Sequence, residues 1–150
     1  MRRTALLVLI FTTTLDRLLK HIALQQSLLS SGEIAHFGIL SFTPFLNNRL
    51  AFSLPLPLII IIILSLGIVT ALFVYFCKLQ NVSQKIALLF VIIGALSNLF
   101  DRIAYRAVID YFSILPHGFF NIADLMIGGG IAALLFTTHN KSAGNKLKCS

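Results

Sequence analysis

The sequence predicts an all-α membrane protein with four transmembrane helices and a small extracytoplasmic loop or β element between the first two. Hydrophobic residues make up 57% of the 150-residue chain and charged residues only 11%, far from the roughly 25% charged content of a typical soluble protein. Mean hydropathy is +0.92. A membrane span needs about 20 mostly apolar residues, and four segments qualify. We therefore treat residues 1–150 as a single membrane domain.

The clearest span contains the charge-free stretch PLIIIIILSLGIVTALFVYFC and is expected at about residues 56–77. The other three are expected at about 4–24, 86–104 and 119–138, each with its charged residues toward one end. The first segment has the basic start and apolar centre of a signal peptide, but it continues into Asp16 and Lys20 without a small-x-small cleavage site. We expect it to be a retained helix.

The distribution of charge along the chain predicts the orientation. Four spans put both termini on one side, and cytoplasmic termini, with a cytoplasmic tail at 139–150, give a modest excess of Lys and Arg in the cytoplasm. All five acidic residues then fall in the outer halves of spans or in the outer loops, at about 25–55 and 105–118. Ionisable residues within spans mark functional sites or paired polar clusters. We expect a site near the extracytoplasmic face.

Polar residues recur at helical spacing on one face of three spans. These stripes are Thr13, Asp16 and Lys20 in the first span, Gly94, Asn98, Asp101 and Arg102 in the third, and Asn121, Asp124 and Gly128 in the fourth. Because the three stripes share one membrane depth, we expect them to face one another. We expect the Gly128–Gly130 run to allow close helix packing.

Each stripe also has a simpler interpretation. Asp16 and Lys20 could form an ion pair at a helix end. Asn121 and Asp124 could be the N-cap of the fourth helix and its partner at the third position. Asp101 and Arg102 could be a charge pair that ends the third helix. These three separate interpretations would have to coincide at one side of the membrane. A single shared site explains that coincidence more easily.

Two carboxylates that converge in a low-dielectric pocket share a proton, which is the state that aspartic proteolysis uses. Alternative chemistries have little support. Ser53, Ser97 and Ser113 lack a GxSxG or SxxK context, and the two cysteines form no CxxC. The four histidines show no metal-ligand spacing, and no dense basic run is interleaved with aromatics. We therefore expect no metal, no cofactor and no nucleic-acid partner.

The order of the segments DRLLK, NNRLAFS, GALSNLFDR, VIDYF and FNIAD resembles lipoprotein signal peptidase, the signal peptidase II family of bacterial membrane aspartic peptidases, from Asp16 to about Gly130. The resemblance implies removal of signal peptides from diacylglyceryl-modified prolipoproteins, by cleavage before the lipobox cysteine. It also implies location in the bacterial inner membrane, contact with membrane lipid, and inhibition by cyclic peptide antibiotics.

The resemblance further implies that Asp110 and Asp124 are the catalytic pair, although helical spacing alone would have favoured Asp101. It implies substrate-binding or supporting roles for Asp16, Lys20, Asn47, Ala51, Phe52, Asn98, Asp101, Arg102 and Asn121.

The chain departs from the family pattern at several positions. Arg49 stands where the family has Gly, Leu19 replaces Ser or Thr, and Ser97 replaces Gly; the segment between Asp110 and Asp124 is shorter than in typical members. Two other functions are considered. The first is a non-catalytic scaffold that binds lipoproteins through a degenerate site. The second is a proton-coupled carrier, although no inverted repeat is evident.

Overall fold

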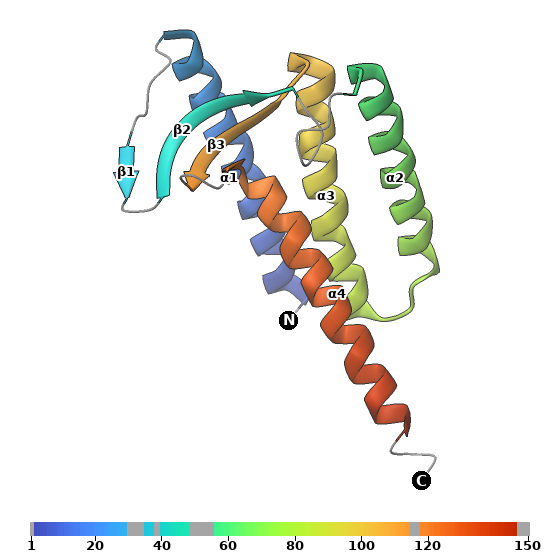
Figure 1. Cartoon of the computed structure of the whole chain (residues 1–150). Helices are drawn as coiled ribbons and strands as arrows, with labels where there is room; N and C mark the ends of the chain where they lie inside the picture. The colour runs from blue at the N-terminus through green and yellow to red at the C-terminus, as the bar shows by residue number, and fades with distance from the viewer. Residues whose placement is uncertain (1, 30–34, 38–39, 49–55, 115–117, 147–150) are drawn as a thin grey trace.

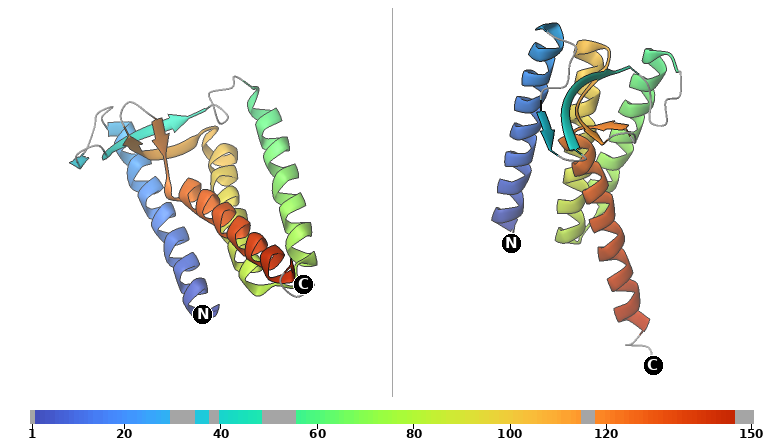
Figure 2. Two further views of the ribbon diagram at one scale, coloured as in Figure 1. Left: turned by 60° about the horizontal axis from the view of Figure 1, so that its bottom comes forward. Right: turned by 60° about the vertical axis from the view of Figure 1, so that its left-hand side comes forward.

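The computed structural model describes residues 2–29, 35–37, 40–48, 56–114 and 118–146. In chain order the elements are α1 (Arg2–Leu29), β1 (Ala35–Phe37), β2 (Leu40–Asn47), α2 (Leu58–Lys78), α3 (Val82–Tyr105), β3 (Val108–Ile114), β4 (Gly118–Phe120) and α4 (Ile122–Lys146). The sheet lies at one end of the helices, whereas α1 begins and α4 ends at the other (Figures 1 and 2).

The four-stranded sheet is antiparallel, in the order β1-β2-β3-β4. Strands β1 and β2 confirm the predicted β element between the first two helices. The all-α class was nevertheless too narrow, because the predicted loop at 105–118 contains β3, and β4 extends from its last residue into the predicted fourth span. The predicted fourth span began at residue 119, but Phe119 and Phe120 pair with β3 and α4 begins only at Ile122.

Pairing between β2 and β3 shifts register between Phe42 and Phe45. Pro44 lies in this interval, and a proline, which has no backbone N–H to give to a ladder, is tolerated in a sheet at such a bulge. Beyond the bulge, Phe45 pairs with Asp110. Asn47 is two residues further on and points to the same face as Phe45, which makes it the diagonal neighbour of Asp110.

Helices α2 and α3 are the two described helices that are long and apolar enough to cross a membrane, with mean hydropathies of 2.9 and 1.9. The apolar part of α4, Ile122–Thr138, is shorter. The β-branched residues that crowd α2 have only moderate helix propensity. In apolar surroundings, however, a helix satisfies every backbone polar group within the segment. At the start of α3, the Asn81 side chain accepts from the backbone N–H of Ser83 at 2.8 Å.

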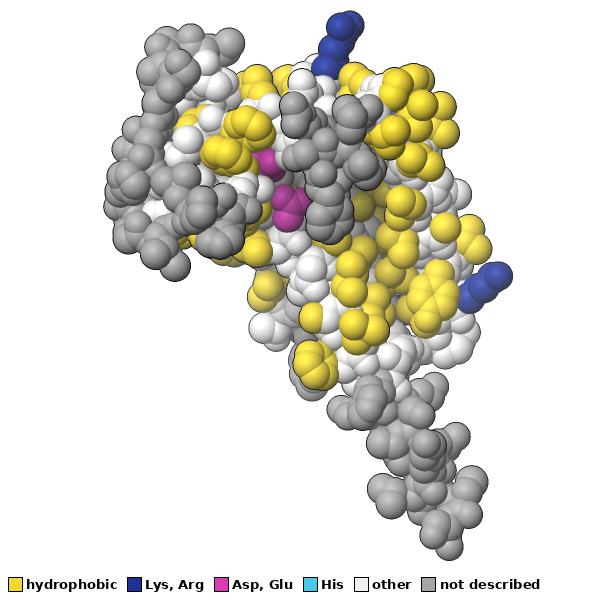
Figure 3. All heavy atoms as spheres, in the orientation of Figure 1, with side chains coloured by type: hydrophobic (Ala, Val, Ile, Leu, Met, Phe, Trp, Pro, Cys, Tyr) yellow, Lys and Arg dark blue, Asp and Glu magenta, His cyan; other side chains and the backbone are white. Residues whose placement is uncertain are grey.

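Large apolar side chains cover the outside of the helices. Phe11, Ile59 and Phe136 are 65%, 62% and 74% exposed, and Figure 3 shows hydrophobic side chains over much of the visible helical surface. An exposed apolar surface of this extent is typical of contact with a membrane.

Two glycines allow α3 and α4 to approach each other closely. A Cβ at Gly94 would lie 2.6 Å from the carbonyl oxygen of Ala123, and one at Gly130 would lie 2.7 Å from that of Ala87. A Cβ at Gly128 or Gly129 would meet nothing within 4 Å. The glycine run therefore serves close packing through Gly130 alone, which lies against the first turns of α3 at Ala87, whereas Gly94 in the middle of α3 lies against the start of α4 at Ala123.

We predict that Gly130→Ala destabilises the protein, because the added methyl meets the backbone of α3. Overpacking of this kind costs about 1–3 kcal/mol. Gly128→Ala is the matched control, and it should be neutral or stabilising by up to about 1 kcal/mol, since Ala is the better helix former. Thermal or denaturant unfolding of both variants in detergent checks this. Equal stability of the two variants would contradict the assigned helix contact.

Candidate active site

A buried ion cluster joins α1 to α3. Lys20 Nζ lies 2.7 Å from Asp101 Oδ2 and 3.3 Å from Asp16 Oδ2. Arg17 Nη2 lies 2.6 Å from the second oxygen of Asp101. Lys20 is 2% exposed, and both carboxylates are fully buried. Because unpaired charges at such depth cost several kcal/mol, the two cations and two carboxylates neutralise one another.

The two aspartates of this cluster also accept hydrogen bonds from the backbone of β3 and α4, next to Asp110 and Asp124. Asp101 Oδ2 accepts a hydrogen bond from the backbone N–H of Ile109 at 3.4 Å, and Ile109 directly precedes Asp110 in β3. Asp16 Oδ1 accepts from the backbone N–H of Ala123 at 3.1 Å, and Ala123 directly precedes Asp124 in α4. One supporting carboxylate thus contacts the segment of each aspartate of the predicted catalytic pair.

Asp110 and Asp124 have a different kind of partner. Asp110 accepts from the side-chain amides of Asn121 at 2.7 Å and Asn47 at 3.0 Å. Asp124 accepts from the side-chain amide of Asn98 at 2.8 Å and the backbone N–H of Asn121 at 3.2 Å. Among the described residues neither carboxylate forms an ion pair. Asn121 contacts both, which brings the two carboxylates to one place.

The orientation of Asn98 is fixed from both sides. Its Oδ1 accepts from Lys20 at 2.9 Å and from Asn121 at 3.3 Å, so its Nδ2 is left to donate to Asp124. Asn121 is fixed similarly, because its Oδ1 accepts from the backbone N–H of Asp124 at 3.0 Å. Asp124 in turn accepts from the backbone N–H of Asn121, and the two reciprocal hydrogen bonds form an N-cap arrangement. The simpler capping interpretation was therefore correct, and the same residues also belong to the site.

Burial raises the pKa of Asp110 to about 6, from an ordinary value of 3.8. The hydrogen bond from Asn47 lowers this pKa, the negative charge of Asp124 raises it, and Asn121 and Lys20 lower it by smaller amounts. The net result is a carboxyl group that exchanges a proton near neutral pH.

Figure 3 shows acidic side chains in a recess at the level of the sheet.

Most of the predicted site residues converge in the structure. Hydrogen bonds or ion pairs of this one network include Asp16, Lys20, Asn47, Asn98, Asp101, Asp110, Asn121 and Asp124. Arg102 interacts electrostatically with Asp101, Asp110 and Asp124. Ala51 and Phe52 lie outside the described residues. Thr13 does not join the network, because its hydroxyl donates to the carbonyl of Leu9 within α1.

Three further residues were not assigned a role from the sequence. Arg17 pairs with Asp101, and its guanidinium carbon lies 5.3 Å from the centre of the Phe100 ring. Ser97 donates to Asp16 Oδ2 at 2.6 Å, and Tyr111 donates to Asp16 Oδ1 at 3.0 Å. The motifs that carry the family resemblance assign roles only to residues next to these three. The position of Ser97 beside Asn98 on α3 was the available signal for that residue.

Ser97 and Lys20 lie within 3.2 Å, which raises the question of a serine–lysine catalytic pair. The geometry argues against it. Ser97 directs its proton to Asp16, and the Lys20 ammonium, which has donors only, already faces oxygens of Asp16, Asn98 and Asp101. The group that accepts the serine proton is Asp16, whose carboxylate is itself ion-paired with Lys20, and the ammonium of Lys20 has no lone pair with which to act as the base. This pair therefore supports the network and is not assigned as a nucleophile and its base.

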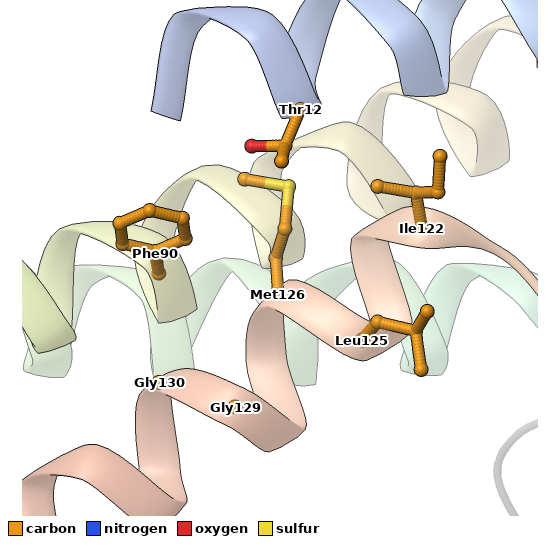
Figure 4. A pocket seen from close by; sticks show the side chains of 7 residues that line it. All are labelled: Thr12, Phe90, Ile122, Leu125, Met126, Gly129 and Gly130. Carbon is orange, nitrogen blue, oxygen red and sulfur yellow. The ribbon is translucent and has the colours of Figure 1, made fainter. Parts of the chain in front are cut away.

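An apolar cavity of about 420 Å³ lies between α1, α3 and α4. Its lining is Thr12, Phe90, Ile122, Leu125, Met126, Gly129 and Gly130 (Figure 4). The Thr12 hydroxyl contacts backbone carbonyls of its own helix. The cavity therefore suits an apolar group, and Ile122 places it beside the first turn of α4.

The fold and the site define a helical membrane protein with two carboxylates held by amides in a buried polar network. The family model described as "Signal peptidase (SPase) II" matches residues 8–140. The chain belongs to the signal peptidase II family, and its membership identifies it as a peptidase and supports a role in removing signal peptides from lipoproteins. The scaffold and carrier alternatives are not favoured.

Individual relatives agree with this assignment. The chain is 33% identical to a lipoprotein signal peptidase of Clostridium novyi, over 85% of this chain and 92% of that protein. It is 31% identical to a lipoprotein signal peptidase of Streptococcus pyogenes serotype M1, over 89% and 91%. Two solved structures described as bacterial membrane enzymes share the fold, with TM-scores of 0.79 and 0.75 at 22% and 24% identity. The first match covers 94% of this chain and 90% of the solved chain, and the second covers 90% of this chain and 92% of the solved chain.

We predict that Lys20→Met lowers the free energy of unfolding by about 3–5 kcal/mol, the usual cost of leaving a buried charge without its partner. Unfolding in detergent measures it. Lys78→Met is the matched control, since Lys78 is exposed in the last turn of α2. Adding Asp16→Asn to Lys20→Met should recover part of the loss, because Asp101 keeps its 2.6 Å ion pair with Arg17 whereas Asp16 loses its nearest cation. Similar stabilities for Lys20→Met and Lys78→Met would contradict the ion cluster.

Proposed function

We propose that this chain is an aspartic endopeptidase that removes signal peptides from diacylglyceryl-modified prolipoproteins, cutting before the lipobox cysteine, with Asp110 and Asp124 as its catalytic residues. The observation that carries the proposal is the difference in partners among the four buried or half-buried aspartates. Asp16 and Asp101 are neutralised by cations, whereas Asp110 and Asp124 are bonded by amides.

Amide partners suit a pair that must share and exchange a proton. A cation beside a carboxylate would hold it ionised, whereas an amide donor stabilises the negative charge only in part and adds no positive charge. Two such carboxylates close together cannot both ionise cheaply, and the pair then retains one proton. The raised pKa of Asp110 supports this state.

The proposed reaction is general acid–base hydrolysis. The ionised aspartate takes a proton from a water molecule, whose oxygen attacks the scissile carbonyl, while the protonated aspartate donates its proton to the carbonyl oxygen. The resulting tetrahedral diol collapses as its C–N bond breaks: the protonated carboxyl gives its proton to the leaving amine, and the ionised carboxylate takes a proton from one diol hydroxyl as the carbonyl re-forms. The pair then again holds one proton. Asn98 and Asn121 keep both carboxylates oriented through the cycle.

The remaining predicted roles belong to this proposal. Asp16, Lys20, Asp101 and Arg102 would support the pair, and Asn47, with Ala51 and Phe52, would contribute to the substrate side. All four helices would span the bacterial inner membrane, with the outer apolar surface in lipid and both termini in the cytoplasm. The site would then face the extracytoplasmic side, where prolipoprotein signal peptides are cut, and cyclic peptide antibiotics would inhibit the enzyme by occupying it.

We predict that Asp110→Asn and Asp124→Asn each abolish cleavage, because an amide cannot exchange the proton, and that both leave the fold largely intact. Asp101→Asn should instead lower stability and activity together, since it disturbs the ion cluster. The measurement is cleavage of a lipidated lipobox peptide by purified variants, alongside their thermal unfolding. Glu33→Gln, outside the described residues, is the matched carboxyl-to-amide control. Near wild-type cleavage by either Asp110→Asn or Asp124→Asn would defeat the assignment.

We also predict a pH effect at Asn47. Asp110 loses its proton as pH rises through about 6, so kcat/KM should decline on the alkaline side if protonated Asp110 is the acid. Asn47→Ala removes a hydrogen bond that lowers this pKa, so the alkaline limb should move to higher pH. Full pH profiles of cleavage measure the shift. Neighbouring Asn48, which is exposed, provides the control Asn48→Ala. A limb that moves to lower pH or stays in place would contradict the role of Asn47.

A further inference from the structure

Tyr111 directly follows Asp110 in β3, and its side chain is completely buried. Its hydroxyl donates to Asp16 Oδ1 at 3.0 Å and accepts from the backbone N–H of Ile122 at 2.9 Å. One hydroxyl therefore joins three elements that are distant in sequence: β3, α1 and the first residue of α4. Burial, followed by the negative charge of Asp16, raises the pKa of Tyr111, so the hydroxyl keeps the proton that it donates.

The first turn of α4 depends on this contact. The first backbone N–H groups of a helix have no partner within the helix. Here the N–H of Ile122 is taken by Tyr111, that of Ala123 by Asp16, and that of Asp124 by Asn121. Two of the three partners come from outside the local segment. The helix end that carries Asp124 is thus held by the strand that carries Asp110 and by α1.

A second hydroxyl acts on the same carboxylate. Ser97 in α3 donates to Asp16 Oδ2 at 2.6 Å, while Tyr111 donates to Oδ1. With a hydroxyl on each oxygen, the Asp16 carboxylate cannot rotate without breaking a hydrogen bond. Its remaining contact on Oδ1 is the N–H of Ala123, so the fixed carboxylate also fixes the start of α4.

We propose that Tyr111, assisted by Ser97, is a positioning residue: its hydroxyl sets the separation of Asp110 and Asp124 by tying β3 to the first turn of α4 through Ile122 and Asp16. The proposal rests on the proposed function of the pair. Neither hydroxyl touches the Asp110 or Asp124 carboxylate, so the effect is on geometry. A misplacement of about 1 Å can cost roughly 100-fold in rate.

Tyr111 also has a packing role, and the test must separate the two. Its ring centre lies 5.8 Å from that of Phe42 and 5.0 Å from that of Phe112, in a core with Ala23 and Ile109. Phenylalanine retains the ring and these contacts and removes only the hydroxyl. Tyr111→Phe is therefore the variant of choice. Tyr75→Phe, at an exposed position of α2, is the matched control.

The experiment measures cleavage of a lipidated lipobox peptide by the purified full chain. We expect kcat of Tyr111→Phe to fall by about tenfold or more, toward the roughly 100-fold limit for misplaced groups, with KM within about twofold of wild type. Thermal unfolding corrects for any unfolded fraction. Hydrogen exchange at the amides of Ile122 and Ala123 should accelerate in Tyr111→Phe and stay unchanged in Tyr75→Phe. A wild-type kcat, or a loss no greater than the unfolded fraction, overturns the proposal.

Ser97→Ala provides the second variant if Tyr111→Phe folds poorly. It removes one of the two hydroxyls from Asp16 and should lower kcat less than Tyr111→Phe, again with KM preserved; no change in kcat counts against the proposal. The two proposals fail differently. A wild-type chain that leaves the lipidated peptide uncut defeats the proposed function itself. Equal kcat for wild type and both hydroxyl variants defeats only the positioning role.

Discussion

The buried ammonium of Lys20 is the interaction on which the rest of the site depends. A cation at this depth requires nearby carboxylates, and the two that it contacts, Asp16 and Asp101, come from α1 and α3. Asp16 then holds the start of α4, and Asp101 holds the start of β3. The requirement to neutralise one charge thus fixes the relative positions of four elements. The stability of the fold and the geometry of the proposed catalytic pair are connected at this point.

Charge compensation also explains how aspartates in one polar network can behave differently. An ion-paired carboxylate is committed to its ionised form, whereas one bonded by amides can gain or lose a proton without stranding a cation. Asn98 lies between the two kinds of carboxylate: its side-chain oxygen accepts from Lys20, and its side-chain nitrogen donates to Asp124. It transmits orientation from the ion cluster while keeping the positive charge one residue away from the proposed dyad. Replacing that amide by a direct lysine contact would hold Asp124 ionised.

Helical periodicity predicted much of the site but not its centre. It placed Asn98 and Asp101 on one face of α3, and both lie in the network. Gly94, on the same face, instead packs against Ala123. Periodicity could not place Asp110, because a strand that pairs with β2 has no helical spacing; the motif resemblance supplied that residue. Neither periodicity nor the motif resemblance predicted a role for Tyr111, because an aromatic residue in an apolar run is expected in a core. The role of its hydroxyl depends on partners that are 95 and 11 residues away in the sequence.

The register of the β3–β4 hairpin accounts for the meeting of Asp110 and α4. Phe112 pairs with Phe120 and Ile114 with Gly118, so continuing the antiparallel register by two residues brings Ile122 opposite Asp110. The chain changes from strand to helix at that point, and the N-terminal turn of α4 is delivered directly to the strand that carries the other carboxylate. The short separation between Asp110 and Asp124 is therefore compatible with a complete site, because local pairing determines the meeting point. The hydroxyl of Tyr111 joins β3 to the start of α4 from the opposite face of the strand, because successive side chains of a strand point to opposite faces. One strand can thus carry the carboxylate proposed as catalytic on one face and a structural hydrogen bond on the other.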